Sequence, residues 1–337
     1  IEAEIYPKDA ALLDKFTSAR IYYLATVAWQ RFLVDDEGLL ADFYYNYEKA
    51  LNIKRINIDR IGWRELKQIA RQISEVNMSN ARSKFNSNVY HQRDELQGIF
   101  EKFLSSDKTA FILLGKSGVG KTNFLISQFD NLEKDSDLFV FYSGSKLDTN
   151  IPLVELITND FVGNLQSNEF NQGEKNIFDI LSKAQIMSNK KLIIIIDAIN
   201  ENESARLLLE QIDTLITKNS DSWLKIIFSS RPEAWRIIKR GVKLAESNYF
   251  HKIQPDELDT SPFMYSSEIK PFTHDELPIV YEKYRLAYQL QTSFDRLPYK
   301  IRDVISDPLL LRLLSRIHAK NPILQDLKVD DITKIYI

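Results

Sequence analysis

Residues 115–122 read Gly115-Lys116-Ser117-Gly118-Val119-Gly120-Lys121-Thr122 and match every position of the pattern G-x-x-x-x-G-K-[ST]. The preceding residues 109–114 form a short apolar run typical of a buried strand, and residues 123–129 can begin a helix. Glycines allow successive backbone N–H groups to converge on phosphate oxygens at the start of such a helix. The stretch therefore predicts a phosphate-binding loop between a strand and a helix.

Two side chains of this loop have distinct predicted roles. Lys121 would reach the β- and γ-phosphates of a nucleoside triphosphate, and the hydroxyl of Thr122 would ligate Mg²⁺. The other loop residues, together with Asn123, complete the predicted nucleotide contacts. A chance match in a glycine-rich loop is the alternative, but the strand and helix on either side favour the binding loop.

Composition excludes several classes of protein. The 337 residues are 44% hydrophobic and 27% charged, which is ordinary for a globular chain and enough for two or three domains. A net charge of -3 with no strongly basic half argues against a dedicated nucleic-acid binder. Because cysteine is absent, disulfides, thiol catalysis and cysteine-ligated zinc are excluded.

No membrane segment is predicted. The longest mostly apolar run near the N-terminus, residues 21–29, is far shorter than the ~20 residues that span a bilayer, and no signal peptide is visible. We therefore expect a cytoplasmic protein. The chain begins at Ile1 rather than Met, and residues 331–337 resemble the start of a further domain, so we expect a fragment of a longer protein.

The N-terminal part, residues 1–85, has the pattern of a helical region or linker. Apolar side chains at helical spacing predict helices over residues 8–35, 39–51 and 63–76. The aromatic residues between Tyr22 and Tyr47 are interpreted as helix-packing core or an interface rather than a cofactor site.

Residues 86–272 alternate between short apolar strands and helices. Strands are predicted at 111–114, 138–142, 192–196, 224–228 and 249–253, and helices at 121–130, 152–162, 174–188 and 203–218. The alternation predicts an α/β fold with a parallel sheet and flanking helices on both faces. Residues 273–330 return to helices, at 273–288 and 300–319, and form a predicted helical lid.

An acidic residue ends one predicted strand. Residues 191–197 read Lys-Leu-Ile-Ile-Ile-Ile-Asp, the form expected of a Walker B element. Because ligands of parallel sheets lie at the carboxyl ends of the strands, Asp197 would lie beside the Mg²⁺ held by Thr122. The alternative is a strand followed by a turn, and the complete phosphate loop upstream favours the metal site.

Two more charged residues follow strands at the same predicted edge. Glu201 could orient or deprotonate an attacking water, or only cap the helix that runs from about Ser204. Arg231 carries a planar guanidinium that suits a γ-phosphate, and the alternative is a surface arginine before a proline turn. The predicted catalytic set is therefore Lys121, Asp197, Glu201 and Arg231.

Five segments occur in a specific order along the chain. They are the phosphate loop, Asp-Ala-Ile-Asn-Glu at 197–201, Ser-Ser-Arg-Pro at 229–232, Lys-Pro-Phe-Thr-His-Asp-Glu-Leu at 270–277 and Asp-Pro-Leu-Leu-Leu-Arg-Leu-Leu at 307–314. Together they resemble P-loop NTPases of the STAND class, of the NACHT-like or AP-ATPase-like type. The resemblance covers about residues 88–320 and implies a signal-transduction ATPase that switches between a closed ADP state and an oligomeric ATP state.

The resemblance also implies roles for single residues. Val89, Tyr90 and Arg93 would lie near the adenine. Arg231 would be the sensor arginine, and Pro308 would pack on the base. Pro308 also suits the first turn of a helix, where its missing N–H costs nothing.

The function that the resemblance implies is an ATP/ADP-binding switch with slow, Mg²⁺-dependent ATPase activity. Asn200 stands where the family commonly has an acidic residue. This departure is compatible with Mg²⁺ binding by Thr122 and Asp197, but hydrolysis is expected to be slow. The expected partners are further copies of the chain in the ATP state and an unknown trigger ligand or protein, in defence or stress response.

Two other functions remain open. One is an AAA+-like remodelling ATPase acting on protein or nucleic acid, although such a motor carries its glutamate directly after the aspartate, where this chain has Ala198. The other is an interaction module with a structural nucleotide. The basic run at residues 236–243 fits nucleic acid or a solvated helix face, and the negative net charge favours the helix face.

Overall fold

The computed structural model describes residues 63–132, 137–164, 177–178, 190–219, 223–252 and 265–320. All of them belong to one compact unit of the chain, Ile61–Leu165 with Lys175–Ile337. The predicted helices at 8–35 and 39–51, most of the helix at 174–188, and residues 331–337 lie outside the described residues.

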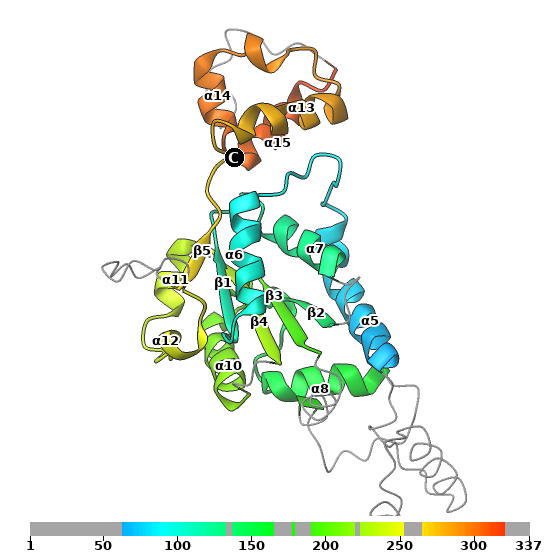
Figure 1. Cartoon of the computed structure of the whole chain (residues 1–337), viewed down its shortest axis with the longest axis vertical. Helices are drawn as coiled ribbons and strands as arrows, with labels where there is room; N and C mark the ends of the chain where they lie inside the picture. The colour runs from blue at the N-terminus through cyan, green and yellow to red at the C-terminus, as the bar shows by residue number, and fades with distance from the viewer. Residues whose placement is uncertain are drawn as a thin grey trace, which may run out of the picture. The chain divides into compact units, whose positions relative to one another are not determined.

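A five-stranded parallel sheet forms the centre of the described structure (Figure 1). The strands lie in the order β2-β3-β4-β1-β5. Their bounds are Ala110–Leu114 (β1), Leu138–Ser143 (β2), Leu192–Asp197 (β3), Leu224–Ser230 (β4) and Ser266–Glu268 (β5). Almost every residue of the first four strands is buried, because helices cover both faces of a parallel sheet. The predicted α/β fold with a parallel sheet and flanking helices is confirmed.

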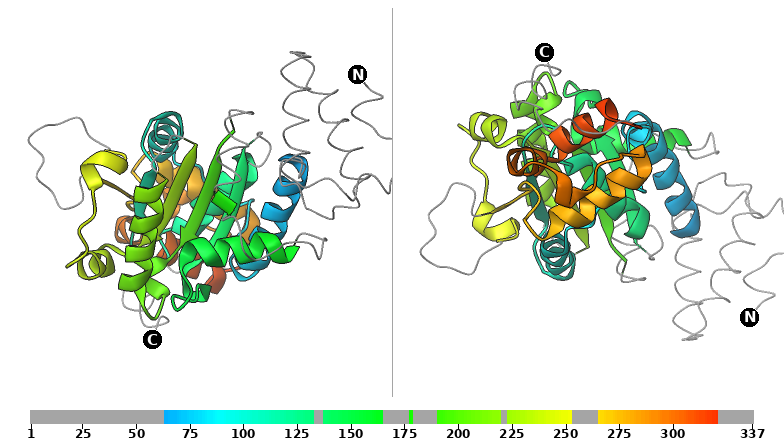
Figure 2. Two further views of the ribbon diagram at one scale, coloured as in Figure 1. Left: turned by 90° about the horizontal axis from the view of Figure 1, so that it is seen from below. Right: turned by 90° about the horizontal axis from the view of Figure 1, so that it is seen from above.

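Helices pack on the two faces through different residues of each strand. Phe111, Leu113 and Ile195 belong to a core cluster with α6 (Asp94–Ser105) and α7 (Lys121–Leu132). On the other side of the sheet lie α8 (Leu153–Asn164) and α10 (Ala205–Lys218), as Figure 2 shows. Two short helices, α11 (Pro232–Ile238) and α12 (Glu246–Tyr249), follow β4.

Helix α5 (Trp63–Arg82) covers the free edge of the sheet. It lies along β2, the strand at one end of the order. The hydroxyl of Ser74 accepts a hydrogen bond from the backbone N–H of Phe141 at 2.9 Å and donates one to the carbonyl of Ala70 at 2.7 Å. The helix runs past the predicted end at residue 76 because Met78, in its next turn, is fully buried in the core.

A small helical lid follows β5. It consists of α13 (Glu276–Tyr288), α14 (Tyr299–Ile305) and α15 (Pro308–Ile317), packed around their own apolar cluster. The prediction of one helix over 300–319 was wrong. The chain breaks at Asp307, whose carboxylate accepts hydrogen bonds from the N–H groups of Leu309 and Leu310, and a new helix begins at Pro308.

The predicted strand at 249–253 was also wrong. Residues 246–249 form α12, and Phe250 makes only an isolated parallel bridge with Ala110. The fifth strand is instead β5, which pairs with residues 112–114 of β1. Both segments therefore lie on the same side of β1, and the polar pair Ser266 and Ser267 gives β5 no apolar signal.

The helix α6 was not predicted, and its C-terminal end is held by one lysine of β4 and by another that directly precedes β3. Lys225, a buried residue of β4, donates to the carbonyls of Ser106 at 2.7 Å and Lys108 at 2.5 Å. Lys191 donates to the carbonyl of Leu104 at 2.6 Å. Burial lowers the pKa of Lys225 to about 8, and cations at a helix C-terminus are stabilising.

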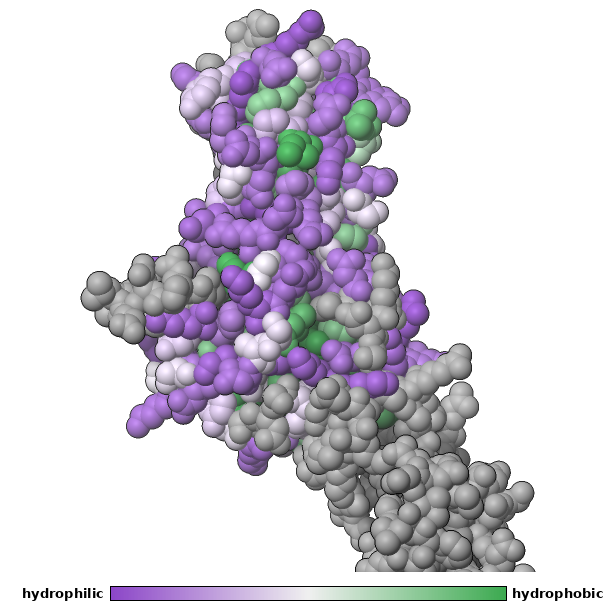
Figure 3. All heavy atoms as spheres, in the orientation of Figure 1, coloured by the Kyte–Doolittle hydropathy of each residue, from purple (hydrophilic) through white to green (hydrophobic). Residues whose placement is uncertain are grey.

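The surface is mostly hydrophilic on the face in Figure 3, with apolar side chains in separate places. The exposed large apolar residues belong to different elements and include Val76, Ile237, Leu286 and Tyr299. Within the described residues, no helix combines the length and apolar character that crossing a membrane requires.

We predict that Ser74→Ala lowers the free energy of unfolding by about 1–3 kcal/mol, because the buried N–H of Phe141 loses its acceptor. Urea titration of the native and variant chains measures the difference. Ser79→Ala is the matched control, since its exposed hydroxyl bonds only the carbonyl of Val76, and a change within about 0.5 kcal/mol is expected. Equal losses in the two variants would show that Ser74 does not anchor the edge strand.

Candidate functional site

The loop between β1 and α7 has a backbone that depends on its glycines. Gly118 and Gly120 have φ of 77° and 107°, which L side chains rarely adopt. A Cβ at Gly115 would lie 2.7 Å from Cγ1 of Val119, so the loop closes tightly at its start. At Gly120 a Cβ would meet nothing within 4 Å, so the space on that side of the backbone is open.

Lys121 bridges the two ends of this loop. Its side chain is largely buried, and Nζ donates to the carbonyls of Gly115 at 2.7 Å and Lys116 at 3.0 Å. An ammonium has three donors, so two are used inside the loop. Burial lowers the pKa of Lys121, while the negative charge of Asp197 opposes that effect.

Asp197 joins three segments that are far apart in the sequence. At the end of β3, its Oδ2 accepts a hydrogen bond from Oγ1 of Thr122 at 2.6 Å. Its Oδ1 accepts one from Oγ of Ser229, in β4, at 2.5 Å. Ser229 in turn accepts the backbone N–H of Ala198 at 2.8 Å. The structure thus brings the predicted pair Thr122 and Asp197 together and adds Ser229, which lies in the Ser-Ser-Arg-Pro segment at 229–232 but had no predicted role.

The turn after Asp197 is held in a fixed shape. Ala198 is left-handed, with φ of 58°, and residues Ile199–Glu201 form a single 3-10 turn. Asn202 donates from Nδ2 to the carbonyls of Gly144 at 2.7 Å and Leu147 at 2.8 Å. A Cβ at Gly144 would lie 2.6 Å from the carbonyl oxygen of Ala198, so only glycine fits beneath the turn.

This turn places Glu201 and Asn200 beside Arg231. Nη2 of Arg231 lies 3.6 Å from Oε1 of Glu201, and its backbone N–H donates to Oδ1 of Asn200 at 3.1 Å. Both charged side chains are about half exposed (46% and 50%), so water screens the pair and it contributes little to stability. The described contact of Glu201 is thus with the predicted sensor arginine.

These residues fit a metal that is shared with phosphate oxygens. Among the described residues, no group of three His, Cys, Asp or Glu side chains could hold a metal ion alone. Mg²⁺ commonly uses one or two carboxylates together with substrate phosphates. The adjacent oxygens of Thr122 and Asp197, next to the open cradle at Gly120, match that requirement.

The first turn of α15 contacts the tip of the loop. A Cβ at Gly118 would lie 2.8 Å from both Cβ and Cδ2 of Leu309, the second residue of that helix. Pro308 is buried at the first helical position. The lid therefore touches the loop through the residue next to the predicted base-packing proline.

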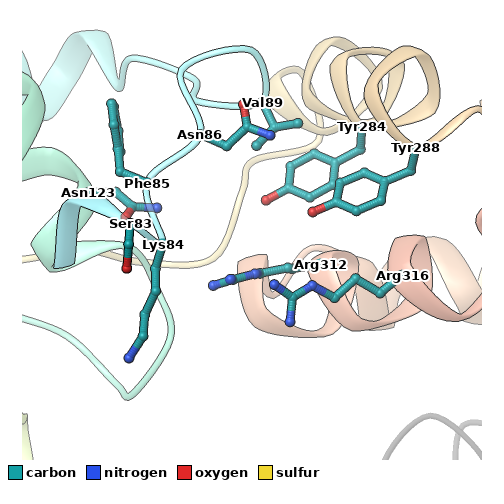
Figure 4. Close-up of a pocket in the computed structure, with 10 residues that line it drawn as sticks. All are labelled: Ser83, Lys84, Phe85, Asn86, Val89, Asn123, Tyr284, Tyr288, Arg312 and Arg316. Carbon is teal, nitrogen blue, oxygen red and sulfur yellow. The ribbon is translucent and has the colours of Figure 1, made fainter. Parts of the chain in front are cut away.

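The three residues predicted near the adenine have different surroundings. Val89 and Asn123 line one pocket of about 340 Å³ (Figure 4). The ring of Tyr90 packs on Phe85 with centroids 5.5 Å apart, and burial raises its pKa.

Arg93 holds the connection between β5 and α13. It donates to the carbonyl of Lys270 at 2.9 Å, lies 4.3 Å from the ring centre of Phe272 and 3.7 Å from a carboxylate oxygen of Glu276. The described contacts of Arg93 are thus with the chain segment that leads into the lid.

Other pocket residues were not identified from the sequence, because they come from distant elements. The second wall consists of lid residues, namely Tyr284, Tyr288, Arg312 and Arg316. A pattern of four-residue spacing on two helices was the only signal that could have pointed to them.

Comparison with protein families gives one match. The family model described as Nephrocystin 3, N-terminal, matches residues 146–231, which include the strand with Asp197 and the end of β4. The match covers less than half of the chain. No curated protein matches the chain.

Several solved structures are similar to this chain in fold. Cdc6p from Pyrobaculum aerophilum has 16% identity and a TM-score of 0.41, over 67% of this chain and 59% of that protein. The ORC2 protein of Aeropyrum pernix, solved in ADPNP–ADP complexes, has 15% identity and a TM-score of 0.44, over 75% and 70%. Domain III of the replication initiation protein DnaA from Thermotoga maritima has 13% identity and a TM-score of 0.38, over 71% and 88%. The chain spans less than two thirds of Cdc6p.

We predict that Gly118→Ala destabilises the chain by about 1–2 kcal/mol through its left-handed backbone, and further through the contact with Leu309. Combining it with Leu309→Ala removes the contacts with the two Cδ atoms and should recover their share, while the contact with the Cβ at 309 and the backbone part remain. Urea unfolding of both single variants and the double variant measures the interaction. Gly98→Ala is the control, because a Cβ in that helix meets nothing within 4 Å. A Gly118→Ala variant as stable as Gly98→Ala would contradict the loop geometry.

Proposed function

We propose that the chain is an ATP- and ADP-binding molecular switch of the STAND class of P-loop NTPases, whose nucleotide state controls self-assembly. The observation that carries the proposal is the joined arrangement of Thr122, Asp197 and Ser229 beside Lys121 at one edge of a parallel sheet. This edge is where parallel α/β sheets bind their ligands.

Each residue of the site has a role that follows from its position. A bound Mg²⁺–ATP would supply the reactive phosphoanhydride and its negative charge. The N–H groups of the loop and the buried ammonium of Lys121 would neutralise that charge. Thr122 and Asp197, whose oxygens are adjacent, would hold the metal, and Ser229 would keep Asp197 oriented.

Glu201 and Arg231 would distinguish the two nucleotides. Arg231 is exposed enough to leave Glu201 and contact a γ-phosphate, which ADP lacks. Glu201 would then be free to orient or deprotonate a water. Asn200, which accepts the N–H of Arg231, replaces the usual second acidic residue, so we expect slow hydrolysis.

The contact between Leu309 and Gly118 supplies a route from the site to the lid. A ligand shifts a conformational equilibrium only if it binds the two states with different affinity. Occupancy of the loop would act on α15 directly, because that helix begins against the loop tip. In this proposal the ATP state exposes a surface for further copies of the chain, after an unknown trigger, in a cytoplasmic defence or stress response.

The same sheet order and helical lid also suit an AAA+-like remodelling ATPase. Glu201 comes four residues after Asp197, beyond the left-handed turn at Ala198, and not directly after the aspartate, which favours the switch over the motor. A motor would show continuous, stimulated turnover, and an interaction module with a structural nucleotide would show no hydrolysis.

We predict that Lys121→Ala abolishes ATP binding and any ATP-dependent assembly, because the phosphates lose the buried ammonium. Calorimetric titration with ATP and size measurement with a non-hydrolysable ATP analogue and with ADP give the two readouts.

Glu201→Gln is the matched control for this variant. It should keep ATP affinity and assembly and lose hydrolysis, since the carboxylate lies at the rim of the site. Normal ATP affinity in Lys121→Ala would overturn nucleotide binding at this loop. Identical size with the analogue and with ADP would overturn the switch and leave nucleotide binding standing.

A further inference from the structure

The connection between α5 and α6, residues 83–93, contacts both the nucleotide-binding domain and the lid, and we call it the strap. Phe85 packs against the core cluster that α6 and α7 form with one face of the sheet. Val89, four residues later, packs against the apolar cluster of the lid. One short segment thus has an apolar side chain against each of the two cores. Movement of the lid away from the sheet would have to break one of these contacts.

Polar contacts join the strap to α13, the first helix of the lid. Nζ of Lys283 donates to the carbonyl of Tyr90 at 2.8 Å. Nη1 of Arg93 and Nε2 of His91 lie 3.7 Å and 4.0 Å from the two carboxylate oxygens of Glu276. The side chains of Arg93 and Glu276 are only 14% and 22% exposed, so water screens this pair less than a surface ion pair.

Glu276 also sets the start of α13. Its Oε2 accepts the backbone N–H of Thr273 at 2.9 Å, and the hydroxyl of Thr273 accepts the N–H of Glu276 at 3.2 Å. This reciprocal pair is a capping box, in which either Glu or Gln can serve. The same carboxylate therefore fixes the helix start and faces Arg93 of the strap. Because glutamine keeps the first role and loses the charge of the second, one substitution separates them.

Arg93 also holds the chain that leads from β5 into the lid. It donates to the carbonyl of Lys270 at 2.9 Å and lies 4.3 Å from the ring centre of Phe272. The backbone N–H of Phe272 in turn donates to the carbonyl of Ser306, just before α15, at 2.8 Å. Burial lowers the pKa of Arg93, and the carboxylate of Glu276 opposes that effect. The strap therefore contacts the connection between sheet and lid as well as the lid itself.

We propose that the strap holds the lid against the nucleotide-binding domain through Arg93, Lys283 and Glu276, and that these contacts slow the release of bound nucleotide. The inference rests on the proposed function and names how that same site is regulated. Val89 of the strap and Tyr284, the neighbour of Lys283 on α13, line one pocket of the site. Separation of the strap from the lid would widen that pocket and open a path for the nucleotide.

The first measurement is the distance between the lid and the sheet in the chain without nucleotide. The chain contains no cysteine, so Ile237→Cys and Tyr299→Cys, at two exposed positions outside the strap, provide a pair of sites for spin labels. Glu276→Gln removes the charge that faces Arg93, and Lys283→Met removes the donor to the strap. Each change should broaden or shift the distance distribution, measured by pulsed electron paramagnetic resonance.

Glu282→Gln is the matched control. It breaks an ion pair with Arg285 on the same helix, and the carboxylate of Glu282 is half exposed, so the contacts with the strap remain. This variant should keep the native distance distribution. Equal distributions in the native chain, in Glu276→Gln and in Lys283→Met would overturn the inference.

The second measurement is the rate at which a fluorescent ADP analogue leaves the unlabelled chain after excess ADP is added. Glu276→Gln and Lys283→Met should each speed release by roughly threefold to tenfold, the range for loss of one partly buried polar contact. Glu282→Gln should release the analogue at the native rate.

The two measurements separate the inference from the proposed function. Unchanged release with an altered distance distribution would mean that the strap positions the lid without controlling the nucleotide, and the inference would be wrong. A native chain that binds no ADP would count against the proposed function. The distance measurement, made without nucleotide, would then still decide whether the strap holds the lid.

Discussion

The carboxylate of Asp197 is the interaction on which the site depends. It accepts one hydroxyl from Thr122 after the phosphate loop and another from Ser229 at the end of β4. Three segments separated by tens of residues are thereby fixed at one sheet edge. Each of the two carboxylate oxygens of this buried side chain therefore accepts a hydrogen bond from one hydroxyl.

The strand order explains why these groups meet. β4 lies between β3 and β1, with parallel pairing on both sides. Ser229 and Arg231, at the end of β4, are therefore placed between the phosphate loop, which follows β1, and the turn after β3. The helices on both faces and α5 along β2 bury this sheet, and the first turn of α15 brings the lid against the tip of the phosphate loop.

Much of the sheet and part of the candidate site could be predicted from the sequence. Apolar runs predicted β1 to β4. The alternation of strands and helices predicted a parallel sheet, and because parallel strands end at the same edge, Thr122 and Asp197 were expected to lie together, as they do. β5 was not predicted because Ser266 and Ser267 pair with β1 through their backbone and show no apolar pattern in the sequence. The lid break at Asp307 was missed because apolar periodicity continues across it, although the Asp-Pro pair carried the signal. The contact of Ser229 with Asp197, and the pocket that lid residues share with Val89 and Asn123, depend on which strands and helices become neighbours. No local sequence pattern predicts those neighbours.

The central claim is that Asp197 and Thr122 form the metal half of a nucleotide site. The most direct measurement is calorimetric titration of ADP into the native chain and into Asp197→Asn, each with and without Mg²⁺. We expect Mg²⁺ to raise ADP affinity by roughly tenfold or more in the native chain and to have little effect in the variant, because an amide is a poorer ligand for a hard cation. The same gain from Mg²⁺ in both chains, or no ADP affinity in the native chain, would contradict the account.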